Sequence, residues 1–360
     1  MTQDKAKRYS NIKYALFFIG TAYTLILLYL FLALGLSFRL SQWLGNGFFT
    51  VPLYLAILSI GYYLLDFPLN FYQSYTLEHK FSLSKQSLSD WLKDQLKAGL
   101  ISYFIGLILL SAFYLILRYS FNNWWLIISL FWIFFSIVLA KVMPIVIIQL
   151  FFKYKKLEDE VLRQRVLGLA SKMKVKIIDC FQIDFSKKTL KANAAFVGIG
   201  NTRRVILADT LKDKYTYDEI EVILAHEFAH YQLKHLVKLI VINSITTLVI
   251  FYLIFKTNNY ALGLFNLSSL TDVAALPLVF IYFMLFSIAT RPLEAFISRS
   301  FERSAYSLAI ETTNLKDAFV SSMNKLADQN LADRSPNPII KFFFFDHPPI
   351  DERIKIAQSE

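Results

Sequence analysis

The chain has 360 residues, of which 56% are hydrophobic and only 18% are charged, and its formal net charge is +11. A composition this apolar, with long uncharged runs, excludes an ordinary soluble domain and indicates an integral membrane protein. The basic excess favours contact with anionic membrane lipid, and because no basic helix or aromatic–basic repeat occurs we expect no nucleic-acid partner.

Six runs are long and apolar enough to span a membrane, which predicts a mainly α-helical integral membrane protein with about six transmembrane helices. The first run follows basic residues and is too long for the core of a signal peptide, so we expect an uncleaved span. The six runs are residues 14–38, 48–72, 99–117, 124–148, 236–255 and 273–290.

Lysine and arginine gather on alternate sides of these runs. They precede the first span, occupy the loop at 73–98, and follow the fourth and sixth spans, whereas the other loops are poor in them. The positive-inside rule therefore places both termini, and the region between spans four and five, in the cytoplasm. No C-terminal dilysine or other obvious ER-retrieval signal occurs, so we expect a bacterial inner membrane rather than the ER.

The organisation predicts two regions: an N-terminal membrane region at 1–152 and a second region at 153–360 that includes a two-span hairpin at 236–290. In the second region, KLEDEVLRQRVLGLASKMKV is typical of an amphipathic helix. The runs IIDCFQID and RRVILAD are β-like, and Gly200-Asn201 between them is typical of a turn. We therefore expect a cytoplasmic α+β domain. The helix's expected apolar face comprises Val161, Val166, Leu167, Leu169 and Ala170.

The segment YDEIEVILAHEFAHYQL, preceded by Thr216, predicts a helix with acidic residues in its first turn. His226 and His230 are four residues apart, which places both imidazoles on one face at the spacing that two nitrogen ligands of zinc require. Glu227 lies beside the metal position and can take a proton from an attacking water. The alternative is a surface helix whose histidines merely cap or pair. His235 is nine residues from His226, on the opposite face of a continuous helix, and is not counted as a ligand.

Two imidazoles need a third protein ligand to hold a catalytic zinc. Span five leaves the cytoplasmic side directly after the HExxH helix, and span six returns to that side. The first glutamates after this return are Glu294 and Glu302, and both could reach the histidines. The polar surroundings of Glu302, in SRSFERS, favour it slightly, although either could instead pair with a neighbouring arginine.

These stretches resemble the integral-membrane CAAX prenyl proteases, zinc endopeptidases of the a-factor-converting type. AHEFAHYQLKH and SRSFERSAYSLA resemble the family's metal-binding segments, and LEHKFSLSKQSLSDWLKDQLKAG resembles its cytoplasmic segment between early spans. KANAAFVGIGNTRRVILADTL resembles its edge strand and hairpin, and DHPPIDERI resembles its C-terminal motif. The resemblance covers nearly the whole chain from about Tyr14.

The resemblance implies a membrane-embedded zinc endopeptidase that hydrolyses peptide bonds near the cytoplasmic membrane surface. It implies one zinc ion per chain and a peptide or protein substrate, with C-terminally lipidated chains among the candidates. It assigns the general base to Glu227 and places His347 and Arg353 near the site, where a hydrogen-bonding or cationic group could stabilise an oxyanion; DHPPIDER could also be only a proline-stiffened turn. The implied metal ligands are His226, His230 and Glu302, and the implied substrate-binding strand residues are Asn193 and Ala194.

Two features depart from the family pattern. Tyr306 stands where the family has an aspartate, four residues after Glu302, and so on the same helical face. Its neutral hydroxyl could orient a ligand without adding charge, and we expect Tyr306→Asp to raise metal retention or activity. The family also has seven spans, whereas six are predicted here. Both departures favour the alternative of an inactive relative that binds peptides or partner proteins, and the retention of Glu227 counts against it.

Overall fold

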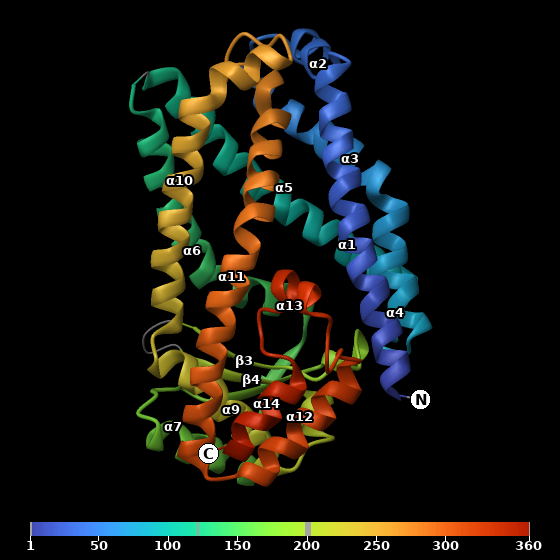
Figure 1. The fold of residues 1–360 in the computed structure, drawn as a ribbon, viewed down its shortest axis with the longest axis vertical. Helices are drawn as coiled ribbons and strands as arrows, with labels where there is room; N and C mark the ends of the chain where they lie inside the picture. The colour runs from blue at the N-terminus through green and yellow to red at the C-terminus, as the bar shows by residue number, and fades with distance from the viewer. Residues whose placement is uncertain (1, 121, 199–202, 360) are drawn as a thin grey trace.

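The computed structural model describes residues 2–120, 122–198 and 203–359. The molecule is elongated, with long helices at one end and a four-stranded sheet with shorter helices at the other. Both ends of the described chain lie toward the sheet-bearing end (Figure 1). The predicted fold class, mainly helical with a smaller α+β part, is confirmed.

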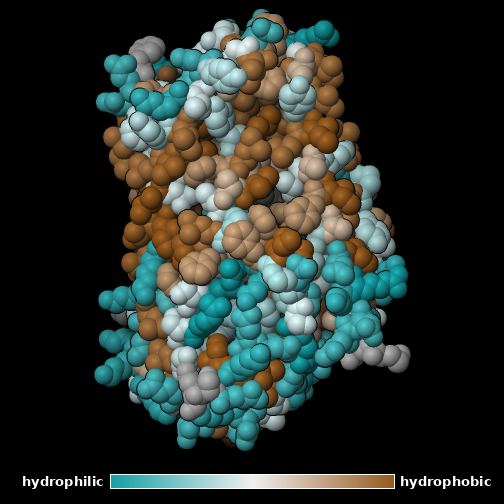
Figure 2. All heavy atoms as spheres, viewed as in Figure 1, coloured by the Kyte–Doolittle hydropathy of each residue, from teal (hydrophilic) through white to brown (hydrophobic). Residues whose placement is uncertain are grey.

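Six helices of the described chain are long and apolar enough to cross a membrane, as predicted. Figure 2 shows hydrophobic atoms over these helices and hydrophilic atoms over the sheet-bearing end. Four of them, α1, α5, α10 and α11, run well beyond the apolar runs that predicted them, because a helix satisfies its own backbone in water as it does in lipid. The six are α1 (Thr2–Ala33), α3 (Thr50–Phe71), α5 (Leu88–Tyr119), α6 (Trp124–Phe151), α10 (His235–Leu264) and α11 (Leu276–Thr313).

The first predicted span, 14–38, is wrong at its end. Helix α1 stops at Ala33, and Gly35 adopts a left-handed conformation with φ 67°, which suits glycine because it has no Cβ. A separate nine-residue helix, α2 (Leu36–Leu44), follows. The other short elements next to the candidate spans are η1 (Tyr72–Thr76) and α4 (Leu77–Lys80) after α3, and η4 (Val273–Ala275) before α11.

The sheet has the strand order β1-β2-β4-β3. Strands β2 and β4 are parallel, and both outer pairs are antiparallel. Strand β3 is therefore an edge strand, and within the described chain no strand pairs with its other side. The predicted Gly200-Asn201 turn lies outside the described residues. The strands are β1 (Tyr154–Lys156), β2 (Cys180–Ile183), β3 (Ala194–Val197) and β4 (Arg204–Ala208).

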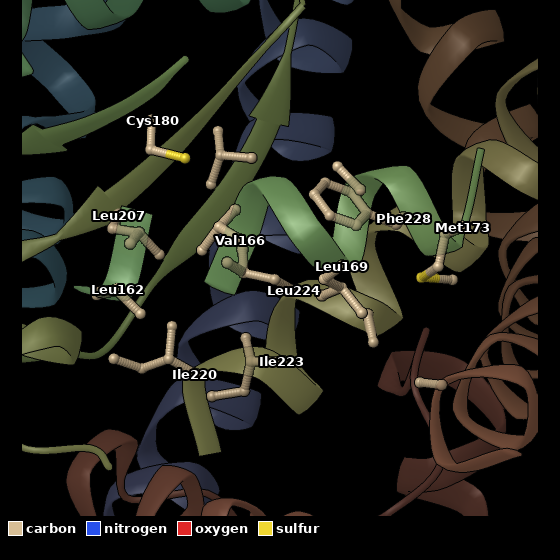
Figure 3. Close-up of a cluster of buried hydrophobic side chains, with 14 of the residues drawn as sticks. Leu162, Val166, Leu169, Met173, Cys180, Leu207, Ile220, Ile223, Leu224 and Phe228 are labelled. Carbon is tan, nitrogen blue, oxygen red and sulfur yellow. The ribbon is translucent and has the colours of Figure 1, made fainter. Parts of the chain in front are cut away.

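A hydrophobic core joins this sheet to α7 (Glu160–Lys172) and α9 (Tyr217–Gln232), as Figure 3 shows. The apolar face predicted for α7 is partly wrong: Val161 is 61% exposed, and Leu162 is fully buried in its place. The buried positions of α7 repeat every three to four residues from Leu162, which is the period of a helix with one packed face. This packing fixes the helix that carries both candidate histidine ligands.

Three of the remaining described helices, α12, α13 and α14, pack around α9 and the part of α11 that lies at the sheet-bearing end. Helix α12 packs against both α9 and α14, and α11 contacts α9, α13 and α14. These elements bring the C-terminal segment back to the HExxH helix. They are η2 (Phe185–Lys187), α8 (Asp209–Lys212), α12 (Lys316–Asn330), α13 (Pro338–Phe344) and α14 (Ile350–Ser359).

Candidate metal centre

The helix that carries the histidines begins with a capping box. The Thr216 side chain accepts a hydrogen bond from the Glu219 amide, and the Glu219 carboxylate accepts one from the Thr216 amide at 2.8 Å. Glu219 is only 2% exposed, and it also accepts hydrogen bonds from Ser321 at 2.6 Å and Lys325 at 2.7 Å on α12. Burial opposes ionisation of Glu219, but these partners outweigh it and lower its pKa. The start of α9 is thus tied to α12.

His226, His230 and Glu302 converge where α9 packs against α11. The His226 Nε2 lies 3.2 Å from Glu302 Oε2, and the His230 Nε2 lies 3.2 Å from Glu302 Oε1. The two Nε2 atoms are 3.1 Å apart, and one ligand atom from each of the three residues lies within 4.8 Å of the others. The residues expected to form the metal site are therefore neighbours in space.

The chemistry of this group fits a metal ion. Glu302 Oε2 is buried, and its approach to His226 Nε2 at 3.2 Å lacks the geometry of a hydrogen bond, a costly arrangement for a carboxylate. Two imidazole nitrogens facing each other at 3.1 Å need a proton or a cation between them. Two imidazoles and one carboxylate, with further coordination positions open, form a donor set typical of catalytic zinc.

Burial sets the electrostatics around the histidines. It lowers the pKa of His226 to about 4 and raises the pKa of Glu227 to about 7. Burial also opposes the charge on His230, but the Glu302 carboxylate outweighs this effect and raises the His230 pKa. Glu227 therefore sits beside the candidate ligands as a carboxyl group whose proton affinity is higher than in water, which suits an acid–base role.

Helix α9 is not continuous with span five, contrary to our expectation. It ends at Gln232, Lys234 adopts a left-handed conformation with φ 56°, and α10 begins at His235. This break turns His235 back toward the site, so its Nδ1 lies 3.0 Å from the Nδ1 of His230. Placing His235 on the opposite face was therefore wrong, because that placement assumed one unbroken helix.

Tyr306 lies against the first candidate ligand. It is 2% exposed, and its ring stacks on the His226 imidazole with centroids 4.2 Å apart and planes inclined by 14°. Its hydroxyl interacts with the Glu302 carboxylate, and the Arg353 guanidinium lies 5.4 Å from the centre of its ring. The sequence predicts only a hydroxyl contact here, because the ring stack depends on how α11 packs against α9.

The C-terminal motif also reaches the site. His347 Nε2 lies 3.3 Å from Glu302 Oε1, and the His347 Nδ1 lies 2.9 Å from Asp346 Oδ1. Asp346 can therefore hold the His347 ring, a role that sequence reasoning missed although the two residues are adjacent. Arg353 lies over Tyr306 and donates a hydrogen bond to the Pro348 carbonyl at 2.6 Å, so it reaches the site through these two residues.

Strand β3 runs beside α9, and Phe196 packs edge-on against Phe228 with ring centroids 5.4 Å apart. Asn193 precedes this strand and is exposed, and its carbonyl accepts a hydrogen bond from Ala208 at 3.1 Å. Ala194 is paired with Leu207 on β4. An extended peptide can add to the free side of such a strand.

The other candidate for third ligand, Glu294, lies elsewhere. Its carboxylate accepts a hydrogen bond from Thr290 at 2.8 Å. It lines a cavity of about 280 Å³ between α10, α11 and the segment after α13, together with Asn243, Arg291 and Asp346. Eight residues of helix separate Glu294 from Glu302, which is about 12 Å along the axis. The cavity therefore adjoins the site through Asp346, the partner of His347.

Two family models together match nearly the whole chain. Residues 156–360 match the model described as peptidase family M48. Residues 1–153 match the model described as CAAX prenyl protease N-terminal, five membrane helices, and the described part of that stretch holds four candidate spans.

Individual proteins are similar over most of their length. An uncharacterized metalloprotease of Bacillus subtilis, YhfN, is 31% identical over 99% of this chain and 85% of its own. CAAX prenyl protease 1 of Saccharomyces cerevisiae is 30% identical over 84% of this chain and 70% of its own. The crystal structure of S. mikatae Ste24p shares the fold, with a TM-score of 0.87 at 24% identity over 99% of this chain and 88% of that chain.

Proposed function

Because this chain belongs to peptidase family M48, and is therefore a multi-pass membrane metalloprotease acting on a peptide or protein, we propose that its metal is one Zn²⁺ per chain, held by His226, His230 and Glu302. The convergence of these three side chains carries the proposal. Family membership does not favour the alternative of an inactive relative that only binds peptides or partner proteins.

A zinc ion held by His226, His230 and Glu302 would act as a Lewis acid on the scissile carbonyl and on the attacking water. Glu227 takes the proton of the attacking water and delivers it to the leaving amine, consistent with its raised pKa. His347, oriented by Asp346, donates a hydrogen bond to the oxygen of the scissile carbonyl as negative charge develops there. Arg353 adds positive charge close by, from above the Tyr306 ring.

The substrate backbone adds to β3 as an extended strand, with its hydrogen bonds near Asn193 and Ala194. The free edge of β3 beside α9 supports this arrangement. Backbone pairing selects for extended chain rather than for particular side chains. It therefore suits a protease that takes an exposed, flexible segment near a membrane surface.

The test compares the purified parent protein with Glu227→Gln and His226→Ala. We expect about one zinc per parent chain and cleavage of a generic extended peptide. Glu227→Gln should retain zinc but lose turnover, since an amide cannot accept the proton of water. His226→Ala should lose most of the zinc because one of its two imidazole ligands is gone. A His226→Ala protein with a full zinc load would overturn the ligand assignment, and a Glu227→Gln protein as active as the parent would overturn the base.

We further propose that the site faces the cytoplasm of a bacterial cell, from its inner membrane. The alternation of basic loops supports this orientation. Two of the relatives are named CAAX prenyl protease 1 or its homolog. These names support the proposal that substrates are cut near the C-terminus and that lipidated chains are among them. The test compares hydrolysis of one peptide with and without a C-terminal prenyl group. Equal kcat/KM for the two forms would show that the protease does not recognise the lipid.

A further inference from the structure

His235 is almost completely buried, at 2% exposure, and the proposed chemistry does not use it. It is the first residue of α10, and the left-handed Lys234 turns it back toward α9. Its ring stacks on Phe301 with centroids 4.6 Å apart and planes inclined by 9°. Phe301 directly precedes Glu302 on α11. His235 therefore lies between the two helices that supply the candidate ligands.

Both ring nitrogens of His235 have partners. Its Nδ1 lies 3.0 Å from the Nδ1 of His230, and its Nε2 lies 3.3 Å from the Ser304 hydroxyl. The Ser304 hydroxyl in turn lies 2.8 Å from the Phe301 carbonyl, to which it can only donate. A chain of polar contacts thus runs from His230 through His235 to α11.

The directions of these hydrogen bonds follow from one premise. If the Nε2 of His230 gives its lone pair to the metal, its proton is on Nδ1 and is donated to the Nδ1 of His235. The proton of His235 is then on Nε2 and is donated to Ser304. Ser304 keeps its own proton for the Phe301 carbonyl. Every donor in this series of hydrogen bonds therefore has one acceptor.

We propose that His235 is a positioning residue, which accepts the Nδ1 proton of His230 and so holds that imidazole in the tautomer and orientation that metal binding needs. The inference rests on the proposed metal site. Histidine ligands commonly donate their second N–H to a carboxylate, a carbonyl or water; here the acceptor is a neutral imidazole. His226 differs, because its Nδ1 has no partner within the described chain and its ring is held by stacking on Tyr306.

The experiment measures zinc affinity of the full-length purified protein by competition with a chromophoric chelator. Four proteins are compared: the parent, His235→Asn, His235→Gln and His235→Leu. The Asn carbonyl oxygen occupies the place of the histidine Nδ1 and can accept from His230. The Gln amide reaches the place of Nε2, next to Ser304, and leaves His230 without its acceptor. Asn and Gln thus carry one functional group at two different positions.

We expect His235→Leu and His235→Gln to bind zinc about 10- to 100-fold more weakly than the parent, the range for losing an outer acceptor of a metal ligand. His235→Asn should remain close to the parent. Thermal midpoints of the metal-free proteins serve as the control for packing, since all three substitutions disturb the stack on Phe301.

Equal zinc affinity in the Leu variant and the parent would overturn the inference. So would an Asn variant as weak as the Gln variant, because the position of the acceptor would then be irrelevant. Failure of the proposed metal site has a different signature: either the parent binds no zinc, or His230→Ala binds it as tightly as the parent. If the Leu variant does not fold, the comparison of Asn with Gln decides the question alone.

Discussion

The stack of Tyr306 on His226 makes a quantitative prediction about the metal centre. Tyr306→Phe removes the hydroxyl and keeps the ring, whereas Tyr306→Leu removes both. The difference between the two variants therefore reports the ring alone, whatever the hydroxyl contributes through Glu302. Stacked and edge-on aromatic pairs contribute about 0.5–1.5 kcal/mol beyond the area they bury. Since 1.4 kcal/mol is a factor of ten, zinc should bind to the Leu variant roughly 2- to 12-fold more weakly than to the Phe variant.

The assay is competition between the protein and a chelator of known zinc affinity, with the unfolding of the metal-free proteins followed in parallel. If Tyr306→Leu only loosened the packing, its thermal midpoint would fall, but its zinc affinity would remain equal to that of the Phe variant. Equal zinc affinity in the Phe and Leu variants would refute the argument that the ring holds His226.

The same geometry argues against the expectation that Tyr306→Asp raises metal retention. The aspartate would leave a gap beside His226 and add a second buried negative charge near Glu302. On this argument the aspartate variant binds zinc more weakly than Tyr306→Phe. Tighter binding would show that outer negative charge matters more than the stack.

Three further predictions follow from other parts of the molecule. Introduced cysteines at Lys85 and Asn259, both exposed, should be labelled from the cytoplasmic and the opposite side, respectively; labelling of both from one side would contradict the proposed hairpin. Glu219→Gln should lower the thermal midpoint at pH 7. Folding lowers the Glu219 pKa below its ordinary value of 4.5, so the difference in thermal midpoint between variant and parent should become smaller as the pH falls below about 4.5. Lys191 lies two residues before Asn193 and forms an ion pair with Glu78 at 2.9 Å. If this pair holds the proposed substrate-binding strand in place, Lys191→Met should raise the KM for a peptide more than it lowers kcat. A change in kcat alone would show that the ion pair does not act on substrate binding.

The sequence predicts best what depends on local spacing. The pair His226 and His230 needs only one helical turn, and the six spans need only length and hydropathy. The predicted start of α9 after Thr216 likewise depends on only four residues, which form a capping box in the structure. These features are set by neighbours along the chain, so no knowledge of the tertiary structure is required to find them.

The features that sequence reasoning missed depend on a backbone bend or on contacts between distant elements. Lys234 adopts a left-handed conformation that is uncommon for a residue with a Cβ, so nothing in YQLKHLV marks a helix break. Without the break, His235 is assigned to the wrong face. The choice between Glu294 and Glu302 likewise depends on where α11 meets α9, which is set by packing and not by local pattern.

One short stretch of α11, from Phe301 to Tyr306, contacts the histidine pair and its surroundings from one side. Phe301 and Ser304 hold His235, Glu302 approaches both histidines, and Tyr306 stacks on His226. Six residues of one helix rise only about 8 Å, so these contacts move together if the helix shifts or rotates. Since α11 continues from a candidate span without interruption, the position of that span in the bilayer constrains the geometry of the metal site. The helix that supplies Glu302 to the proposed metal site is thus itself the extension of a candidate membrane helix, and this continuity supports the proposal that the site lies near the membrane surface.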